Sequence, residues 1–135
     1  MIFLLDSTTF SHLMRHHPRA AAKLTALSAT DRVIICSTVR GEILYGIERL
    51  PSGRRRDELA NLAAPLFAST VCEPVPEAAG DAYANIKRSQ RERGLALDEN
   101  DLWIAATASA LGATLVTTDT DFQRVANLLT ADWTA

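Results

Sequence analysis

Residues 100–125 have the sequence NDLWIAATASALGATLVTTDTDFQRV, and this stretch decides the fold. The segment Leu102 to Leu111 is apolar on nearly all sides, which is typical of a buried helix. The run TLVT, Thr114 to Thr117, follows almost at once and predicts a short buried strand. Asp101 precedes the helix, and Asp119 lies two residues beyond the strand. A buried helix followed by a buried strand is typical of parallel α/β sheets, whose ligand sites form beyond the carboxyl ends of the strands.

The same alternation continues through the rest of the chain. Apolar residues at four-residue steps predict two further helices, at Thr38 to Arg49 and Glu77 to Arg93. Short apolar runs predict the other strands, at Ile2 to Leu5, Val33 to Cys36, Thr70 to Val75 and, more weakly, Asn127 to Thr130. The expected fold class is therefore α/β, with a parallel sheet between helices in one domain over residues 1–135.

The composition is that of an ordinary globular protein. A length of 135 residues is the usual size of one domain, and 47% hydrophobic with 22% charged residues excludes a disordered or low-complexity chain. The net charge of -2 lacks the basic excess of many nucleic-acid-binding proteins, so a polyanion would need a local basic patch. The apolar run Met1 to Leu5 is too short for a signal peptide or a membrane span, so we expect a cytoplasmic protein without a membrane partner.

Acidic residues from four separated segments are expected to converge at one edge of the sheet. They are Asp6, Glu42, Asp101 and Asp119. Between Gly94 and Gln123 the chain has no Lys, Arg or His that could neutralise such a cluster. Two carboxylates about 4 Å apart repel by about 1 kcal/mol in water and about 4 kcal/mol near a protein surface. Carboxylate oxygens suit Mg²⁺ or Mn²⁺, so the sequence predicts a divalent cation and, with it, phosphodiester hydrolysis.

Each acid also has a purely structural explanation. Asp6 could cap the helix that follows the first strand, and Asp98 with Asp101 could form a capping box. Asp119 and Asp121 could be turn residues, and Glu42 could be an exposed helix residue.

At these residues the sequence resembles the PIN-domain ribonucleases and, among them, the VapC toxins of bacterial toxin-antitoxin pairs. The matching stretches are FLLDSTTFSHLMR from Phe3, STVRGEILYGIERL from Ser37, residues 100–125 and the closing LLTADW. The resemblance implies a three-layer PIN-like fold with about five parallel strands. It also implies catalytic roles for Asp6, Glu42, Asp101 and Asp119, and metal binding by Asp6, Asp101, Asp119 and Asp121. The family often has Asp-Thr-Asn where this chain has Asp6, Ser7 and Thr8, so a contact made by that asparagine is replaced or lost.

The same resemblance implies a function. It points to a metal-dependent endoribonuclease that inhibits translation as the toxin of a type II pair, with RNA as substrate, a VapB-type antitoxin as partner, and a homodimer as assembly. A PIN-like nuclease acting on DNA and a catalytically inactive nucleic-acid-binding regulatory domain are the alternatives. A phospho-accepting receiver domain is disfavoured, because it needs a lysine after a late strand and the last one here is Lys87.

Basic and apolar residues give weaker expectations about partners. Arg88 and Arg91 are three apart on one predicted helix and could bind consecutive phosphates of RNA. Arg40, two residues before Glu42, could form a salt bridge with an acid of the site. An antitoxin would need an apolar groove, and six apolar residues lie on segments that could form such a groove. The same residues could equally belong to the core or to a dimer interface. They are Leu13, Met14, Leu50, Leu59, Leu62 and Leu66.

Overall fold

The structure is a computed structural model that describes residues 1–135. Its centre is a five-stranded sheet in the order β3-β2-β1-β4-β5, and every neighbouring pair of strands is parallel. The strands are β1 (Ile2–Leu5), β2 (Arg32–Cys36), β3 (Val71–Glu73), β4 (Thr114–Val116) and β5 (Thr130–Ala131). The predicted α/β class with a central parallel sheet of five strands is confirmed.

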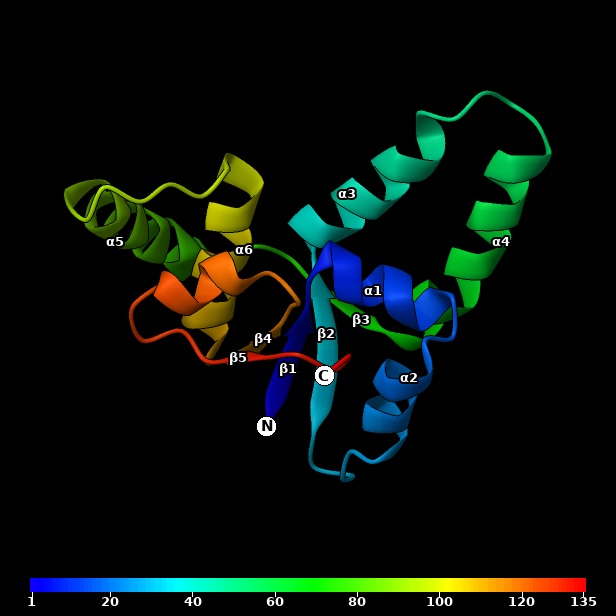
Figure 1. The fold of residues 1–135 in the computed structure, drawn as a ribbon, viewed down its shortest axis with the longest axis horizontal. Helices are drawn as coiled ribbons and strands as arrows, with labels where there is room; N and C mark the ends of the chain where they lie inside the picture. The colour runs from blue at the N-terminus through cyan, green and yellow to red at the C-terminus, as the bar shows by residue number, and fades with distance from the viewer.

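Helices cover both faces of this sheet. In Figure 1, α5 and α6 lie on one side and α1, α2 and α4 on the other, which makes three layers. The α-helices are α1 (Ser7–Met14), α2 (Pro18–Thr25), α3 (Ser37–Glu48), α4 (Arg54–Ser69), α5 (Glu77–Glu92) and α6 (Glu99–Leu111). A short 3₁₀ helix, η1 (Thr120–Arg124), follows β4. No helix is both long enough and apolar enough to cross a membrane.

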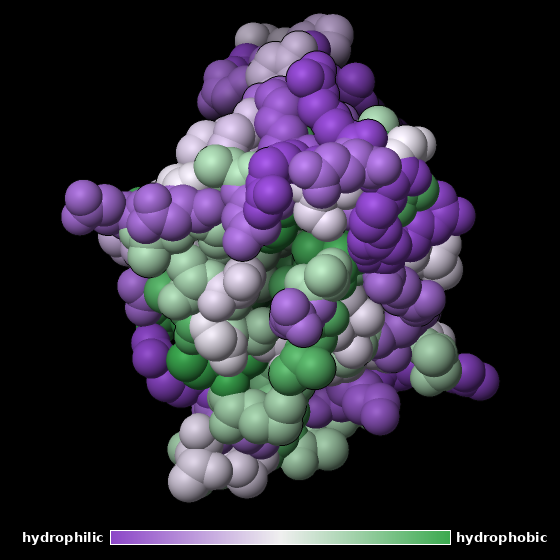
Figure 2. Space-filling view, turned by 90° about the vertical axis from the view of Figure 1, so that its left-hand side faces the viewer, coloured by the Kyte–Doolittle hydropathy of each residue, from purple (hydrophilic) through white to green (hydrophobic).

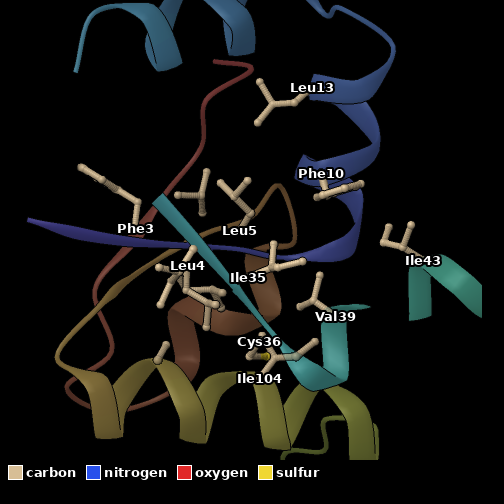
Figure 3. Close-up of a cluster of buried hydrophobic side chains, with 14 of the residues drawn as sticks. Phe3, Leu4, Leu5, Phe10, Leu13, Ile35, Cys36, Val39, Ile43 and Ile104 are labelled. Atoms are coloured by element: carbon tan, nitrogen blue, oxygen red, sulfur yellow. The ribbon is translucent and has the colours of Figure 1, made fainter. Parts of the chain in front are cut away.

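The core is built around the central strand β1. Leu4 and Leu5 are completely buried although neighbouring side chains of a strand point to opposite faces, because both faces of the sheet are covered. Figure 3 shows Phe10 of α1 on one side of the strands and Ile104 of α6 on the other. This explains why β1 is a continuous apolar run rather than an alternating one.

Several boundaries differ from the predicted ones for local reasons. The strand predicted at Thr70 to Val75 ends at Glu73, because Pro74 has no N–H with which to continue the ladder. The strand predicted from Asn127 begins only at Thr130, because Asn127 has a left-handed backbone with φ of 63°. Helices α2 and α4 were not predicted, and Arg54 to Arg56 lie in the first turn of α4.

Candidate active site

The acids gather where the order of the sheet reverses. The chain places β2 on one side of β1 and β4 on the other, so the carboxyl ends of β1 and β4 form a topological switch point. Asp6 directly follows β1, and its N–H donates to the carbonyl oxygen of Val116, the last residue of β4, at 3.1 Å. Ligand sites of open α/β sheets form in the crevice at such a point.

Asp6 caps α1 and keeps one carboxylate oxygen free. Its Oδ1 accepts the N–H of Thr9 at 2.8 Å, which confirms the capping role, and the residue is only 7% exposed. The hydroxyl of Thr9 donates to the carbonyl of Val116 at 3.0 Å and so links α1 to β4. Oδ2 has no hydrogen-bond partner, and because no buried side-chain oxygen is left without a partner, this atom faces solvent. The capping role therefore does not consume the carboxylate.

Only half of the predicted capping box at the start of α6 is formed. Asp98 is the N-cap, and its Oδ1 accepts the N–H of Asp101 at 2.9 Å. The carboxylate of Asp101 makes no reciprocal bond to the N–H of Asp98 and accepts no hydrogen bond from any other group. Capping therefore leaves the half-buried side chain of Asp101 without a partner.

The environment of Asp101 disfavours its negative charge. Burial, followed by the charges of Asp98, Glu42, Asp119 and Asp6, raises the pKa of Asp101 to about 7. None of the salt bridges in the chain includes any of these five acids. The structure therefore brings the four predicted acids into electrostatic contact around Asp101 without supplying a cation. Glu99, another acid of the stretch between Gly94 and Gln123, does have a basic partner from outside it, since Lys87 of α5 lies 3.3 Å from its carboxylate.

Glu42 is held by two donors that the sequence did not single out as functional. Ser7 Oγ donates to Oε1 at 2.6 Å, and Asn100 Nδ2 donates to Oε2 at 3.4 Å. These bonds join the start of α1 and the start of α6 to α3. Ser7 follows Asp6 and Asn100 precedes Asp101, so adjacency to the two acids is the only signal the sequence carried. The half-buried Glu42 is thus a positioned side chain rather than an exposed helix residue.

Asp119 and Asp121 lie at the exposed side of the crevice. Asp119 is the N-cap of η1, where its Oδ1 accepts the N–H of Asp121 at 2.9 Å. Its own N–H donates to the hydroxyl of Thr117 at 3.0 Å. The carboxylate of Asp121 is exposed and makes no hydrogen bond or ion pair. The turn explanation is therefore correct for Asp119, which nevertheless contributes its charge to the cluster.

The chemistry of these donors fits a hard divalent cation, although the ligand set is not preassembled. No three of the Asp, Glu, His and Cys side chains are arranged to hold a metal ion as they stand. Like charges repel, so a cation is needed to draw the carboxylates closer together. Mg²⁺ binds carboxylate oxygens, and Asp6 and Asp101 have oxygens that are free to bind it. No lysine, arginine or histidine side chain lies beside these oxygens to compete with the ion.

Basic residues do not neutralise the cluster. Arg40 lies over the ring of Phe67 at 4.8 Å, so the prediction that it could bridge to an acid of the site is wrong. Arg88 pairs with Glu92 of its own helix at 3.7 Å. Arg91 lines a pocket of about 200 Å³ between the end of α5 and the start of α6. Figure 2 shows the α5 side of the molecule, where hydrophilic side chains gather in the upper half, toward the carboxyl ends of the strands.

A groove of about 310 Å³ leads away from Glu42 between α1, α3 and α4. Three of the predicted apolar residues, Met14, Leu50 and Leu59, line it. Leu13 belongs to the core, Leu66 packs against it, and Leu62 is exposed. Three arginines without ion pairs also line it; two of them belong to basic clusters, around Arg15 and at Arg54 to Arg56, that the sequence offers as a rim of the acidic site, and the third was not singled out. The three arginines are Arg15, Arg49 and Arg55.

Comparison with known proteins identifies the family. Residues 3–128 match the model of the PIN domain. The chain is 29% identical over 137 residues, with 99% of both chains covered, to Ribonuclease VapC1 of Haemophilus influenzae strain R2866. It is 30% identical over 125 residues, with 88% of both covered, to Toxin FitB of Neisseria gonorrhoeae. Among solved structures, VapBC-1 from nontypeable Haemophilus influenzae matches with a TM-score of 0.87 and 26% identity over 100% of both chains. Because the family model covers most of the sequence, this chain belongs to the PIN-domain family.

Proposed function

We propose that this chain is an endoribonuclease that uses Mg²⁺ or Mn²⁺ to hydrolyse phosphodiester bonds of RNA. The observation that supports this most directly is the carboxyl group of Asp101, which is half-buried, has no hydrogen-bond donor and is surrounded by other carboxylates. Such a group is costly in the free protein and becomes favourable when a cation binds beside it. Its position at the switch point of a PIN-domain sheet supports a catalytic use.

The residues that would hold the ion are Asp6, Asp101, Asp119 and Asp121. A bound divalent ion lowers the pKa of water and stabilises charge on the attacking and leaving oxygens. Asp6 contributes its free Oδ2, while its capped Oδ1 keeps the side chain in place. Glu42 is oriented by Ser7 and Asn100, so its carboxylate can accept a proton from water without changing its rotamer.

We further infer that the protein acts as the toxin of a type II toxin-antitoxin pair and inhibits translation. The support is similarity to proteins named VapC ribonuclease and Toxin FitB, and to a toxin solved as a VapBC complex. The partner would be a VapB-type antitoxin, and the groove between α1, α3 and α4 ends at Glu42, where a bound segment would block the site. By the same similarity we expect a homodimer.

The test is cleavage of total RNA by the purified protein with Mg²⁺, with Mn²⁺ and with EDTA, followed by mapping of the ends produced. Asp6→Asn and Asp101→Asn should abolish cleavage while the protein stays folded, because asparagine keeps the helix cap at residue 6. Asp98→Asn is the matched control, since it removes a charge from the same helix start but keeps the cap. Full cleavage by Asp101→Asn, or cleavage that persists in EDTA, would contradict the proposal.

Single-stranded DNA of the same sequence as the cleaved RNA separates the alternatives. RNA cleavage alone supports a ribonuclease, because only RNA has the 2′-hydroxyl group that can be recognised. Cleavage of DNA at an equal rate would favour a nuclease acting on DNA. Binding of either strand without cleavage would favour a regulatory domain.

A further inference from the structure

A hollow of about 430 Å³ opens beside Glu42, between the first turns of α3 and the start of α6. It is separate from the groove described above, and Glu42 lines both. Its lining consists of Ser37, Thr38, Gly41, Glu42, Tyr45 and Asn100. Because Asn100 donates to Glu42, a molecule in this hollow lies directly against the acid cluster.

Tyr45 is an unusual residue for a solvent-exposed helix face. It is 70% exposed, its hydroxyl makes no hydrogen bond, and its ring packs against no other aromatic ring. On α3 it lies three residues after Glu42 and four after Gly41, so the three share one face of the helix. A Cβ atom built on Gly41 would meet nothing within 4 Å, so the helix surface beside the ring is open. A flat group can therefore lie on this surface and stack on the ring.

The polar groups of the hollow are neutral apart from Glu42. No lysine or arginine lines it, so it does not suit a phosphate group. Asn100 uses its Nδ2 on Glu42, and its Oδ1 has no hydrogen-bond donor. The hydroxyl of the exposed Ser37 also has no partner. An aromatic ring beside free neutral donors and acceptors matches the face and the edge of a nucleobase.

We propose that this hollow binds the base of a nucleotide next to the scissile bond, with Tyr45 stacking on the base and Asn100 contacting its edge. The inference rests on the proposed ribonuclease function and assigns a specificity site to it. Phosphates at the carboxylates and a base on Tyr45 are compatible, because Glu42 borders both places.

The first experiment measures RNA binding in EDTA, where no cleavage is expected. The probes are labelled RNA octamers of each of the four bases and an octamer of abasic ribose-phosphate, followed by fluorescence anisotropy. The wild type should bind at least one base-containing octamer about tenfold more tightly than the abasic one, which is the usual effect of one stacked base. Tyr45→Ala should bind both alike, and Tyr45→Phe should keep the difference. Leu44→Ala, the next exposed residue of α3 but outside the hollow, is the matched control.

The second experiment uses cleavage with Mg²⁺ of an RNA that carries the mapped site, with the base on either side of the cut removed in turn. Removal of the base should lower kcat/KM about tenfold, and so should removal of the Tyr45 ring. The two changes together should lower kcat/KM no further than either alone, because both delete the same contact. If, at both flanking positions, the loss of kcat/KM from removing the base adds in full to the loss from Tyr45→Ala, the inference is overturned. A Tyr45→Ala effect that disappears when dimer formation is restored at high protein concentration would also overturn it, since Tyr45 would then contact a second copy. If the wild type prefers base-containing RNA over abasic RNA, Tyr45→Ala loses this preference and no RNA is cleaved, the result contradicts the proposed function but supports the base-binding site.

Discussion

Replacing Asp101 by asparagine should make the metal-free protein more stable at pH 8, and this gain should shrink as the pH falls. The substitution removes a charge that burial and four neighbouring carboxylates disfavour. It keeps the backbone N–H of residue 101, which donates to Asp98, so the start of α6 stays capped. Asp101→Asn therefore reports how much the charge of Asp101 lowers the unfolding free energy, without a change in the capping of α6.

The size of the effect follows from the pKa of Asp101. A rise from 3.8 to about 7 corresponds to at most about 4 kcal/mol of unfolding free energy. Because the side chain is only half-buried, solvent screening reduces this to about 1–2 kcal/mol. The favourable interaction of a first-turn acid with the helix dipole, about 0.3–1 kcal/mol, acts in the opposite direction and favours the lower end of that range.

The sign with pH is fixed by which state holds the proton more tightly. The folded wild type binds a proton at Asp101 up to about pH 7, whereas the unfolded chain loses it near pH 4. The wild type therefore loses stability at this group as the pH rises from 4 to 7, and Asp101→Asn does not. The difference between the two proteins is largest above pH 7.

Urea denaturation in EDTA at pH 5, 6, 7 and 8 measures this difference. The unfolding free energy of Asp101→Asn at pH 8 should exceed that of the wild type by about 1–2 kcal/mol. In thermal unfolding the same gain should raise the melting temperature by about 3–5 °C for each kcal/mol. Asp81→Asn, an exposed acid on α5 without a hydrogen bond or ion pair, is the control and should change stability by less than about 0.5 kcal/mol. Parallel pH profiles for Asp101→Asn and the wild type would refute the view that this carboxyl is strained in the free protein.

Three further outcomes test other parts of the structure. Mg²⁺ in place of EDTA at pH 8 should raise the melting temperature of the wild type and much less that of Asp101→Asn; equal shifts would place the ion elsewhere. Ser7→Ala should lower single-turnover cleavage about tenfold or more at an unchanged melting temperature, because Glu42 loses its donor, and Ser7→Thr should restore most of it. Gly112→Ala should cost about 1–2 kcal/mol in urea, since Gly112 ends α6 with φ of 63° and a Cβ there would meet no neighbour, which leaves backbone strain as the only cost.

The parts of the fold that were predictable are those whose apolar pattern is continuous. β1 is IFLL, and the middle of α6, from Leu102 to Ala108, is almost entirely buried and mostly apolar, so the positions of both follow directly from the sequence. Helix α4 escaped prediction because it begins with three arginines and contains Pro65, a residue that normally ends a helix. Packing against α1, α3 and β3 holds α4 in place, and the contacts with α1 join segments far apart in the sequence, which no local pattern reports.

The acids of the site were predictable as a set, but the choice between capping and catalysis was not, because the two roles do not compete. A carboxylate has two oxygens, and a helix cap uses one of them. Asp6 and Asp119 each give one oxygen to a backbone N–H, and this bond fixes the direction of the other. The sequence pattern for a cap and the pattern for a ligand are therefore identical at these positions. Asp101 is the exception, since Asp98 already caps its helix and both of its oxygens are left over. An acid that local structure does not use, placed among other acids, is the residue at which function rather than folding accounts for the side chain.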